Sequence, residues 1–195
     1  MTTENIKVFE SCDASIVRKS GMNEEVIPSG VYSAECIGPN GEVKWTETFK
    51  NTVTTVGKNS LLDVYLGAST QITTWYFGLI SANSYSAISS SDTMSVHTGW
   101  REAANSGASA PNPQYSQGTR PSASWSAASS GSKSVSAASS FSIITNGTVK
   151  GAFLVSNNTK GGSTGVLYSA GLFTAGDKIV GDGDVLNVSY TATAS

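Results

Sequence analysis

Apolar and polar residues alternate along much of the chain, a pattern typical of β-strands that turn one face toward a core. In residues 31–37, Tyr32, Ala34 and Cys36 share one face. A Gly-Pro-Asn-Gly sequence follows, and it is typical of a turn. A second alternating run covers residues 42–49. Together the two runs predict a β-hairpin.

One short helix is expected over residues 57–67. Asn59 or Ser60 can cap its start, and Gly67 can adopt the left-handed conformation that ends a helix. The apolar residues of this segment fall at helical spacing on one side, namely Leu61, Leu62, Tyr65 and Leu66. We expect this side to pack on the β core and close one end of it.

The middle of the chain combines one apolar strand with a long tract of small residues. Residues 73–80 are almost all apolar or β-branched, which predicts a strand covered on both faces. Residues 81–140 are rich in Ser, Ala, Asn, Gly and Pro. Because aromatic residues interrupt this tract at Trp100, Tyr115 and Trp125, we expect long loops and short strands anchored by aromatics.

The last third predicts further strands at 166–173, 177–180 and 184–191. Before them, residues 141–145 and 148–155 flank an Asn146-Gly147 pair, which favours a type I′ hairpin. The expected fold is therefore mainly β, an antiparallel β-sandwich or jelly roll with one short α-helix, spanning residues 29–195. Residues 1–28 are polar and of mixed charge, and they predict an extended N-terminal arm.

The low charge of the chain favours an assembly component. Only 13% of the residues are charged, against roughly 25% in typical domains. A surface with few charges loses little solvation when it meets another protein. The net charge of −2 gives no basic surface, so a nucleic-acid partner is not expected.

The sequence shows no signal for a membrane or a metal. No apolar run is long enough to span a bilayer, and the first residues lack the features of a signal peptide, so synthesis in the cytoplasm is expected. Cys12 and Cys36 are expected to be reduced thiols. With a single histidine, a zinc site of cysteines and histidines is not expected.

No catalytic site is expected either. His97 lacks a nucleophile motif nearby and is interpreted as a loop histidine that packs or forms hydrogen bonds. Asp177, Asp182 and Asp184 stand among glycines, which favours tight turns over a carboxylate pair or a calcium site. The prediction is a protein that is not an enzyme and holds no cofactor or metal.

Three aromatic residues are the candidate interface: Trp100, Tyr115 and Trp125. Exposed aromatic rings anchor protein interfaces, and they also stack on sugars. Both uses stay open for these side chains, and for Trp100 and Trp125 packing in the core is an equal alternative.

Several segments together resemble the jelly-roll cement, or decoration, proteins on the outside of HK97-type capsids of tailed bacteriophages. The resemblance covers roughly residues 42–192 and is carried by residues 49–53, 57–66, 74–80, 97–102 and 183–190. It implies a virion protein on the capsid exterior, bound to the major capsid protein and to itself as a dimer or trimer, that resists internal DNA pressure. The alternative is a phage tail or fibre component that binds host-surface glycans.

Overall fold

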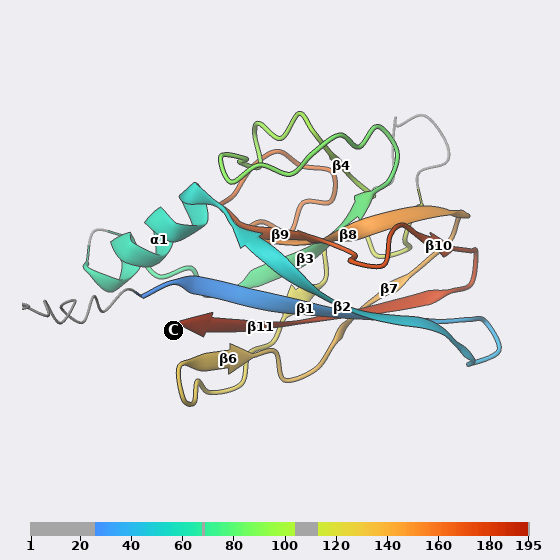
Figure 1. Cartoon of the computed structure of the whole chain (residues 1–195), viewed down its shortest axis with the longest axis horizontal. Coiled ribbons are helices and arrows are strands. Elements are labelled where there is room, and N and C mark those ends of the chain that lie inside the picture. The colour runs from blue at the N-terminus through green and yellow to red at the C-terminus, as the bar shows by residue number, and fades with distance from the viewer. Residues whose placement is uncertain (1–25, 68, 104–112, 195) are drawn as a thin grey trace, which may run out of the picture.

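The structure is a computed structural model and describes residues 26–67, 69–103 and 113–194. In these residues 45% of the chain forms strands, one segment is helical, and all eleven strands pair antiparallel. The strands form the two layers of a β-sandwich (Figure 1). The predicted fold class is confirmed.

The first layer is built around the N- and C-terminal strands. Strand β1 (Pro28–Ile37) lies between β2 (Val43–Val53) and β11 (Val185–Ala194), and β11 also pairs with two short strands, β6 (Ser132–Ser134) and β7 (Ser139–Ser142). The hairpin predicted for β1 and β2 is confirmed. Its turn closes through hydrogen bonds between Gly38 and Glu42 and between Gly41 and Gly38.

The second layer is built around two buried strands. Strand β3 (Trp75–Ser81) pairs with β8 (Gly147–Val155) on one side and with β4 (Arg101–Glu102) and β5 (Ser122–Ala123) on the other. Strands β9 (Leu167–Leu172) and β10 (Lys178–Val180) pair with β8. The predicted strands near 166–173, 177–180 and 184–191 are therefore present.

Strand β2 connects the two layers. Its first part pairs with β1, and its last residues, Asn51–Val53, pair with β9 of the second layer. The layers are thus joined along one side by a shared strand, and the chain leaves β2 directly into helix α1.

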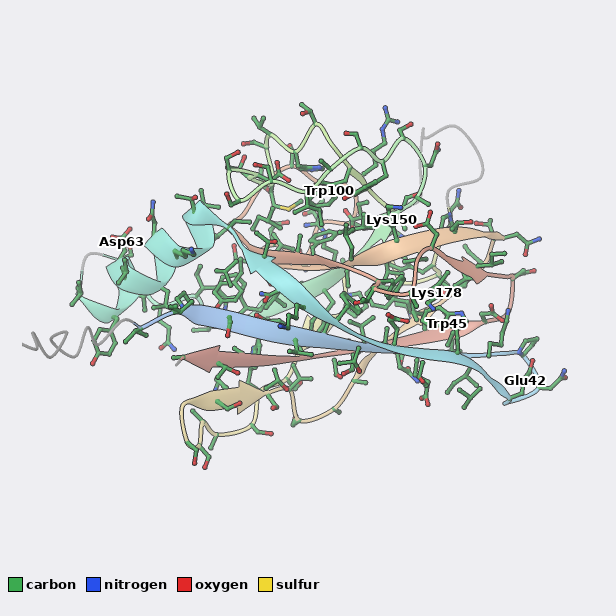
Figure 2. All side chains as sticks on the ribbon, in the orientation of Figure 1. Glu42, Trp45, Asp63, Trp100, Lys150 and Lys178 are labelled. Atoms are coloured by element: carbon green, nitrogen blue, oxygen red, sulfur yellow. The ribbon has the colours of Figure 1, made fainter. Side chains whose placement is uncertain are left out.

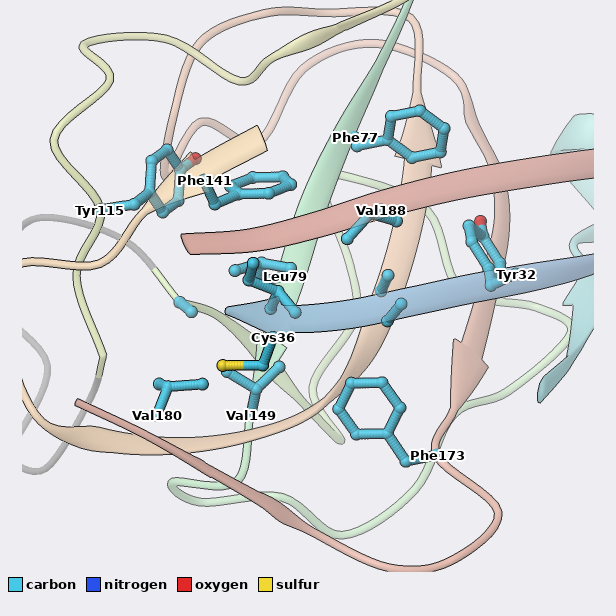
Figure 3. Packing of buried hydrophobic residues seen from close by; sticks show 14 of the residues in the cluster. Tyr32, Cys36, Phe77, Leu79, Tyr115, Phe141, Val149, Phe173, Val180 and Val188 are labelled. Carbon is cyan, nitrogen blue, oxygen red and sulfur yellow. The ribbon is translucent and has the colours of Figure 1, made fainter. Parts of the chain in front are cut away.

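The main core lies between the layers (Figure 3). The face predicted from alternation is the buried one, because Tyr32, Ala34 and Cys36 are at most 4% exposed. The opposite layer contributes Phe77 and Leu79, both fully buried. Burial of such side chains stabilises the fold by roughly 1.5–3 kcal/mol each.

A second core lies on the outer face of the second layer. Residues 82–100 form loops that cover this face, and Met94 and Trp100 from these loops pack with Ile80, Phe153 and Val155. This coverage explains why β3 and β8 are buried on both faces, as their apolar sequences predicted.

The predicted hairpin of residues 141–155 is wrong. Strand β7 pairs with β11 in the first layer, whereas β8 pairs within the second, so the chain crosses between layers at 143–146. Gly147 does not adopt a positive φ. The side chain of Asn146 instead accepts a hydrogen bond from the amide of Asp182 at 3.0 Å, which joins it to a neighbouring turn.

Helix α1 (Thr55–Tyr65) is present, but its cap and packing differ from the prediction. Thr54 is the N-cap, in place of Asn59 or Ser60. The apolar side chains expected on the core are exposed by 44% for Leu61, 53% for Leu62 and 84% for Tyr65. The helix does not close the core, because it extends away from the end of the sandwich (Figure 1).

The N-terminal arm predicted for residues 1–28 lies almost wholly outside the described residues. Its last residue, Pro28, already belongs to β1. Within the described part of the chain, no helix is long and apolar enough to cross a membrane.

A candidate binding groove beneath helix α1

Helix α1 is fixed to the sandwich at its first turn. The Thr54 hydroxyl accepts a hydrogen bond from the Gly57 amide at 3.0 Å and donates to the carbonyl of Leu167. The Thr54 amide donates to the carbonyl of Tyr168 at 3.0 Å. This cap satisfies an otherwise unpaired helical amide and ties the helix to β9.

Gly57 lets the helix approach β9 closely. It is the buried residue of the helix, and a Cβ atom at this position would lie 2.4 Å from the carbonyl oxygen of Tyr168. Only glycine fits so close to another backbone. The first turn therefore touches the strand while the following turns rise away from it.

A groove of about 530 Å³ lies between the rising helix and the sheets. This volume is in the range of pockets that bind ligands or side chains of a partner. Its lining comes from α1, the 71–73 connection, β3, the segment between β5 and β6, β6, β8, β9 and β11. The lining residues are Gly57, Ser60, Leu61, Val64, Tyr65, Gln71, Ile72, Thr73, Trp75, Trp125, Lys133, Leu154, Tyr168 and Ala192.

Aromatic rings form one wall of the groove. Trp75 packs edge-to-face on Tyr168 with ring centroids 5.5 Å apart, and Tyr168 in turn contacts Tyr190 at 6.4 Å. Trp125 contacts the same Tyr190 ring at 6.2 Å. Burial raises the pKa of Tyr168, so its hydroxyl stays neutral at physiological pH.

Two polar groups of the groove bear on what it can bind. The indole Nε1 of Trp125 is buried and has no hydrogen-bond partner. Lys133 is the one charged residue of the lining, and its ammonium donates to the carbonyl of Ser126 at 2.8 Å. With a mainly apolar lining and a single charge, the groove is suited to a mainly apolar segment.

Trp100 does not belong to a surface site, although the sequence suggested an interface role. Its side chain is 1% exposed, and its indole donates to Asp92 Oδ2 at 2.8 Å. It stacks on His97 and packs on Phe153, beneath the loops where Figure 2 labels it. The low solubility of an indole in water and its satisfied N–H explain this burial.

Tyr115 is likewise a core residue and not an interface anchor. It is fully buried and packs edge-to-face on Phe141 at 4.9 Å. Its hydroxyl donates to Glu102 Oε1 at 3.4 Å, and the ammonium of Lys160 lies 4.2 Å from its ring centroid. Of the three aromatic candidates, Trp125 alone reaches the groove.

Two residues considered for catalysis, His97 and Asp184, make hydrogen-bond contacts within the fold. His97 is a loop histidine as expected: its Nδ1 lies 3.1 Å from the carbonyl oxygen of Trp100. Asp184 Oδ2 accepts from the Gly181 amide at 2.7 Å, which confirms a turn role. No group of three or more histidine, cysteine, aspartate or glutamate residues that could hold a metal occurs among the residues described.

Sequence reasoning missed Trp75, Tyr168 and the helix residues as parts of one site. Trp75 and Tyr168 read as ordinary strand residues, and they come from strands almost a hundred residues apart. The available signal was the apolar side of the helix, of which Leu61 and Tyr65 line the groove. No protein-family model matches the chain, and no curated protein matches it.

Proposed function

We propose that this chain is a structural virion protein that binds the outside of a tailed-phage capsid and cements neighbouring major capsid subunits. One observation carries the proposal. Of the eleven large apolar side chains that are exposed in the described residues, six belong to α1, its C-cap or the segment entering β1, namely Val26, Ile27, Leu61, Leu62, Tyr65 and Leu66.

These six residues, the apolar end patch, belong to α1 with its C-cap and to the segment entering β1, and Figure 1 shows both elements toward the same end of the sandwich. Scattered exposed apolar residues are normal, but a cluster of this kind marks a contact surface. Leu62 and Leu66 follow one another by four residues, so they form a row on α1 beside the row that faces the groove. The row of Leu62 and Leu66 is therefore the surface that we expect a second protein to contact.

The mechanism is mechanical. A surface with few charges and one apolar contact binds each capsid subunit weakly, because little area is buried per copy. A symmetric homo-oligomer, dimer or trimer, repeats the contact over a symmetric shell. Simultaneous engagement then raises the overall affinity well above that of one site.

The sequence resemblance to capsid cement proteins favours the head of the virion over the tail. The glycan-binding alternative relied on a platform of Trp100, Tyr115 and Trp125. With Trp100 and Tyr115 buried, no such platform is formed. The cement role therefore agrees better with the surface of the molecule.

The first test is the copy number of this protein per virion, measured by quantitative mass spectrometry on purified particles of the phage that encodes it. We expect hundreds of copies in a simple ratio to the major capsid protein. A handful of copies, in multiples of three or six, would place the protein in the tail and overturn the proposal.

The contact itself can be tested with matched surface variants. We expect Leu62→Glu to lose most of its co-sedimentation with shells that lack this protein, because it places a carboxylate on the apolar end patch. Ile179→Glu is the control, since Ile179 is 74% exposed and belongs to β10, away from α1. Equal binding by both variants and the unchanged protein would exclude the patch as the contact.

A further inference from the structure

The chain enters the sandwich at the rim of the groove. Gly30 of β1 pairs with Ala192 of β11, and Ala192 pairs in turn with Lys133 of β6. Both Ala192 and Lys133 line the groove. Because β1 starts two residues before Gly30, Val26, the first residue that the structure describes, lies four residues along the chain from this pairing.

We propose that the groove beneath α1 is the docking site for residues 6–9 of the same molecule. This segment reads Ile6-Lys7-Val8-Phe9, so three of its four residues are apolar. Phe9 is the only aromatic residue among residues 1–25. The groove has an aromatic, mainly apolar lining and a volume of about 530 Å³, so it can bury the apolar side chains of such a segment.

The linker between the segment and the domain is long enough. Residues 10–25 separate Phe9 from Val26, and an extended chain spans about 3.3 Å per residue, or roughly 50 Å here. The helix that roofs the groove has eleven residues, which corresponds to a length of about 16 Å. The segment can therefore reach every part of the groove.

Tethering favours docking within one molecule over docking in a second copy. A short flexible linker raises the effective concentration of its segment to about the millimolar range. A second copy reaches that concentration only in very concentrated samples. Attachment at the rim of the groove thus selects the chain's own segment as the occupant.

The charge of the groove is matched by the segment. Glu4 and Glu10 flank the apolar residues, and Lys133 is the one charge of the lining. Docking pairs a carboxylate with this ammonium at the rim, where water screens it.

The two cysteines allow a direct test by paramagnetic NMR. Cys36 is buried and its pKa is raised to about 12, so a nitroxide reagent at neutral pH modifies Cys12. Cys12 lies three residues after Phe9. We expect the label to broaden the indole signals of Trp75 and Trp125 strongly. The Trp45 indole donates to the carbonyl of Ile179 and serves as the distant reference (Figure 2).

Variants and mixing complete the test. Phe9→Ser should restore the Trp125 signal, whereas the matched variant Ile16→Ser should leave it broadened. Undiminished Trp75 and Trp125 signals in the labelled protein would overturn the proposal, and so would restoration by Ile16→Ser. A mixture of isotope-labelled protein and spin-labelled, unenriched protein tests docking between two molecules. Broadening that arises only in this mixture would assign the groove to a second copy and would also overturn the proposal.

Discussion

Arg120 and Glu102 form a two-pronged ion pair inside the sandwich. Arg120 Nε donates to Glu102 Oε1 at 2.9 Å and Nη2 donates to Oε2 at 2.7 Å, with the two side chains 0% and 5% exposed. The guanidinium also donates to the carbonyls of Asn157 and Gly162 at 2.9 Å. Glu102 accepts from the Gly161 amide at 2.8 Å. The pair therefore joins β4 to the segment before β5 and to the loop between β8 and β9.

Glu102→Gln should destabilise the fold by about 3–5 kcal/mol, because it leaves the charge of Arg120 buried without a counter-charge. The matched control is Asp177→Asn, which removes the partner of Lys150 where the aspartate is 41% exposed. An exposed pair contributes about 1 kcal/mol or less. Urea unfolding of both variants measures the difference, and equal midpoints would refute a structural role for the buried pair.

Alternation and apolar runs predicted the long strands well, because each of them has a buried face that its own residues specify. Tyr32 and Cys36 on β1 and Phe77 on β3 are buried as the pattern indicates. Arg120 shows the limit of this reasoning. It lies in a tract of small residues without periodicity, and its partner is determined by how distant loops meet.

Two of the wrong predictions, the hairpin of residues 141–155 and the packing of the helix, have a common physical origin. Asn146-Gly147 has the local signature of a tight hairpin, yet β7 gains more by pairing with β11 in the other layer. Leu61 and Leu62 have the spacing of a buried helix face, yet Gly57 anchors only the first turn. In both segments a tertiary contact outside the local pattern decides the outcome. The groove exists because α1 is anchored only at its first turn. The sequence pattern therefore did not predict most of the groove.

Gly57→Ala tests how closely α1 must approach β9. The added methyl group would lie 2.4 Å from the backbone oxygen of Tyr168, so the helix or the strand must shift. Overpacking of this kind costs about 1–3 kcal/mol. Gly118→Ala is the control, because no atom lies within 4 Å of the place its methyl group would take and its φ is not positive. Thermal unfolding of the two variants should differ, and a Gly57→Ala protein as stable as Gly118→Ala would contradict the close contact.

Asp184 makes the stability of the fold sensitive to acid. Burial alone raises the pKa of this carboxyl, but hydrogen bonds from Lys44 at 2.6 Å and from the Gly181 amide at 2.7 Å outweigh burial, and the pKa is lowered. A lowered pKa means that the charged form stabilises the fold above the unfolded pKa of about 3.9. This contribution is lost as the pH falls through the lower, folded value.

The acid dependence is measured by comparing the unchanged protein with Asp184→Asn. We expect the free energy of unfolding of the unchanged protein to fall more between pH 7 and the acid range than that of the variant, which has no carboxyl to protonate at this position. Denaturant titrations at several pH values give both curves. Parallel curves would show that Asp184 does not contribute to acid sensitivity.

The thiol of Cys36 should be protected from reagents until the domain unfolds. Burial and the nearby Asp184 carboxylate raise its pKa to about 12, although the Lys44 ammonium acts in the opposite direction. The thiolate is the reactive form, and at pH 7 almost none is present. A Cys12→Ser protein isolates this thiol. We expect a disulfide reagent to react with it rapidly in denaturant. In buffer the reaction should be only as fast as the folded domain opens. Rapid modification of the folded protein would show that the space between the two layers is open to solvent at Cys36.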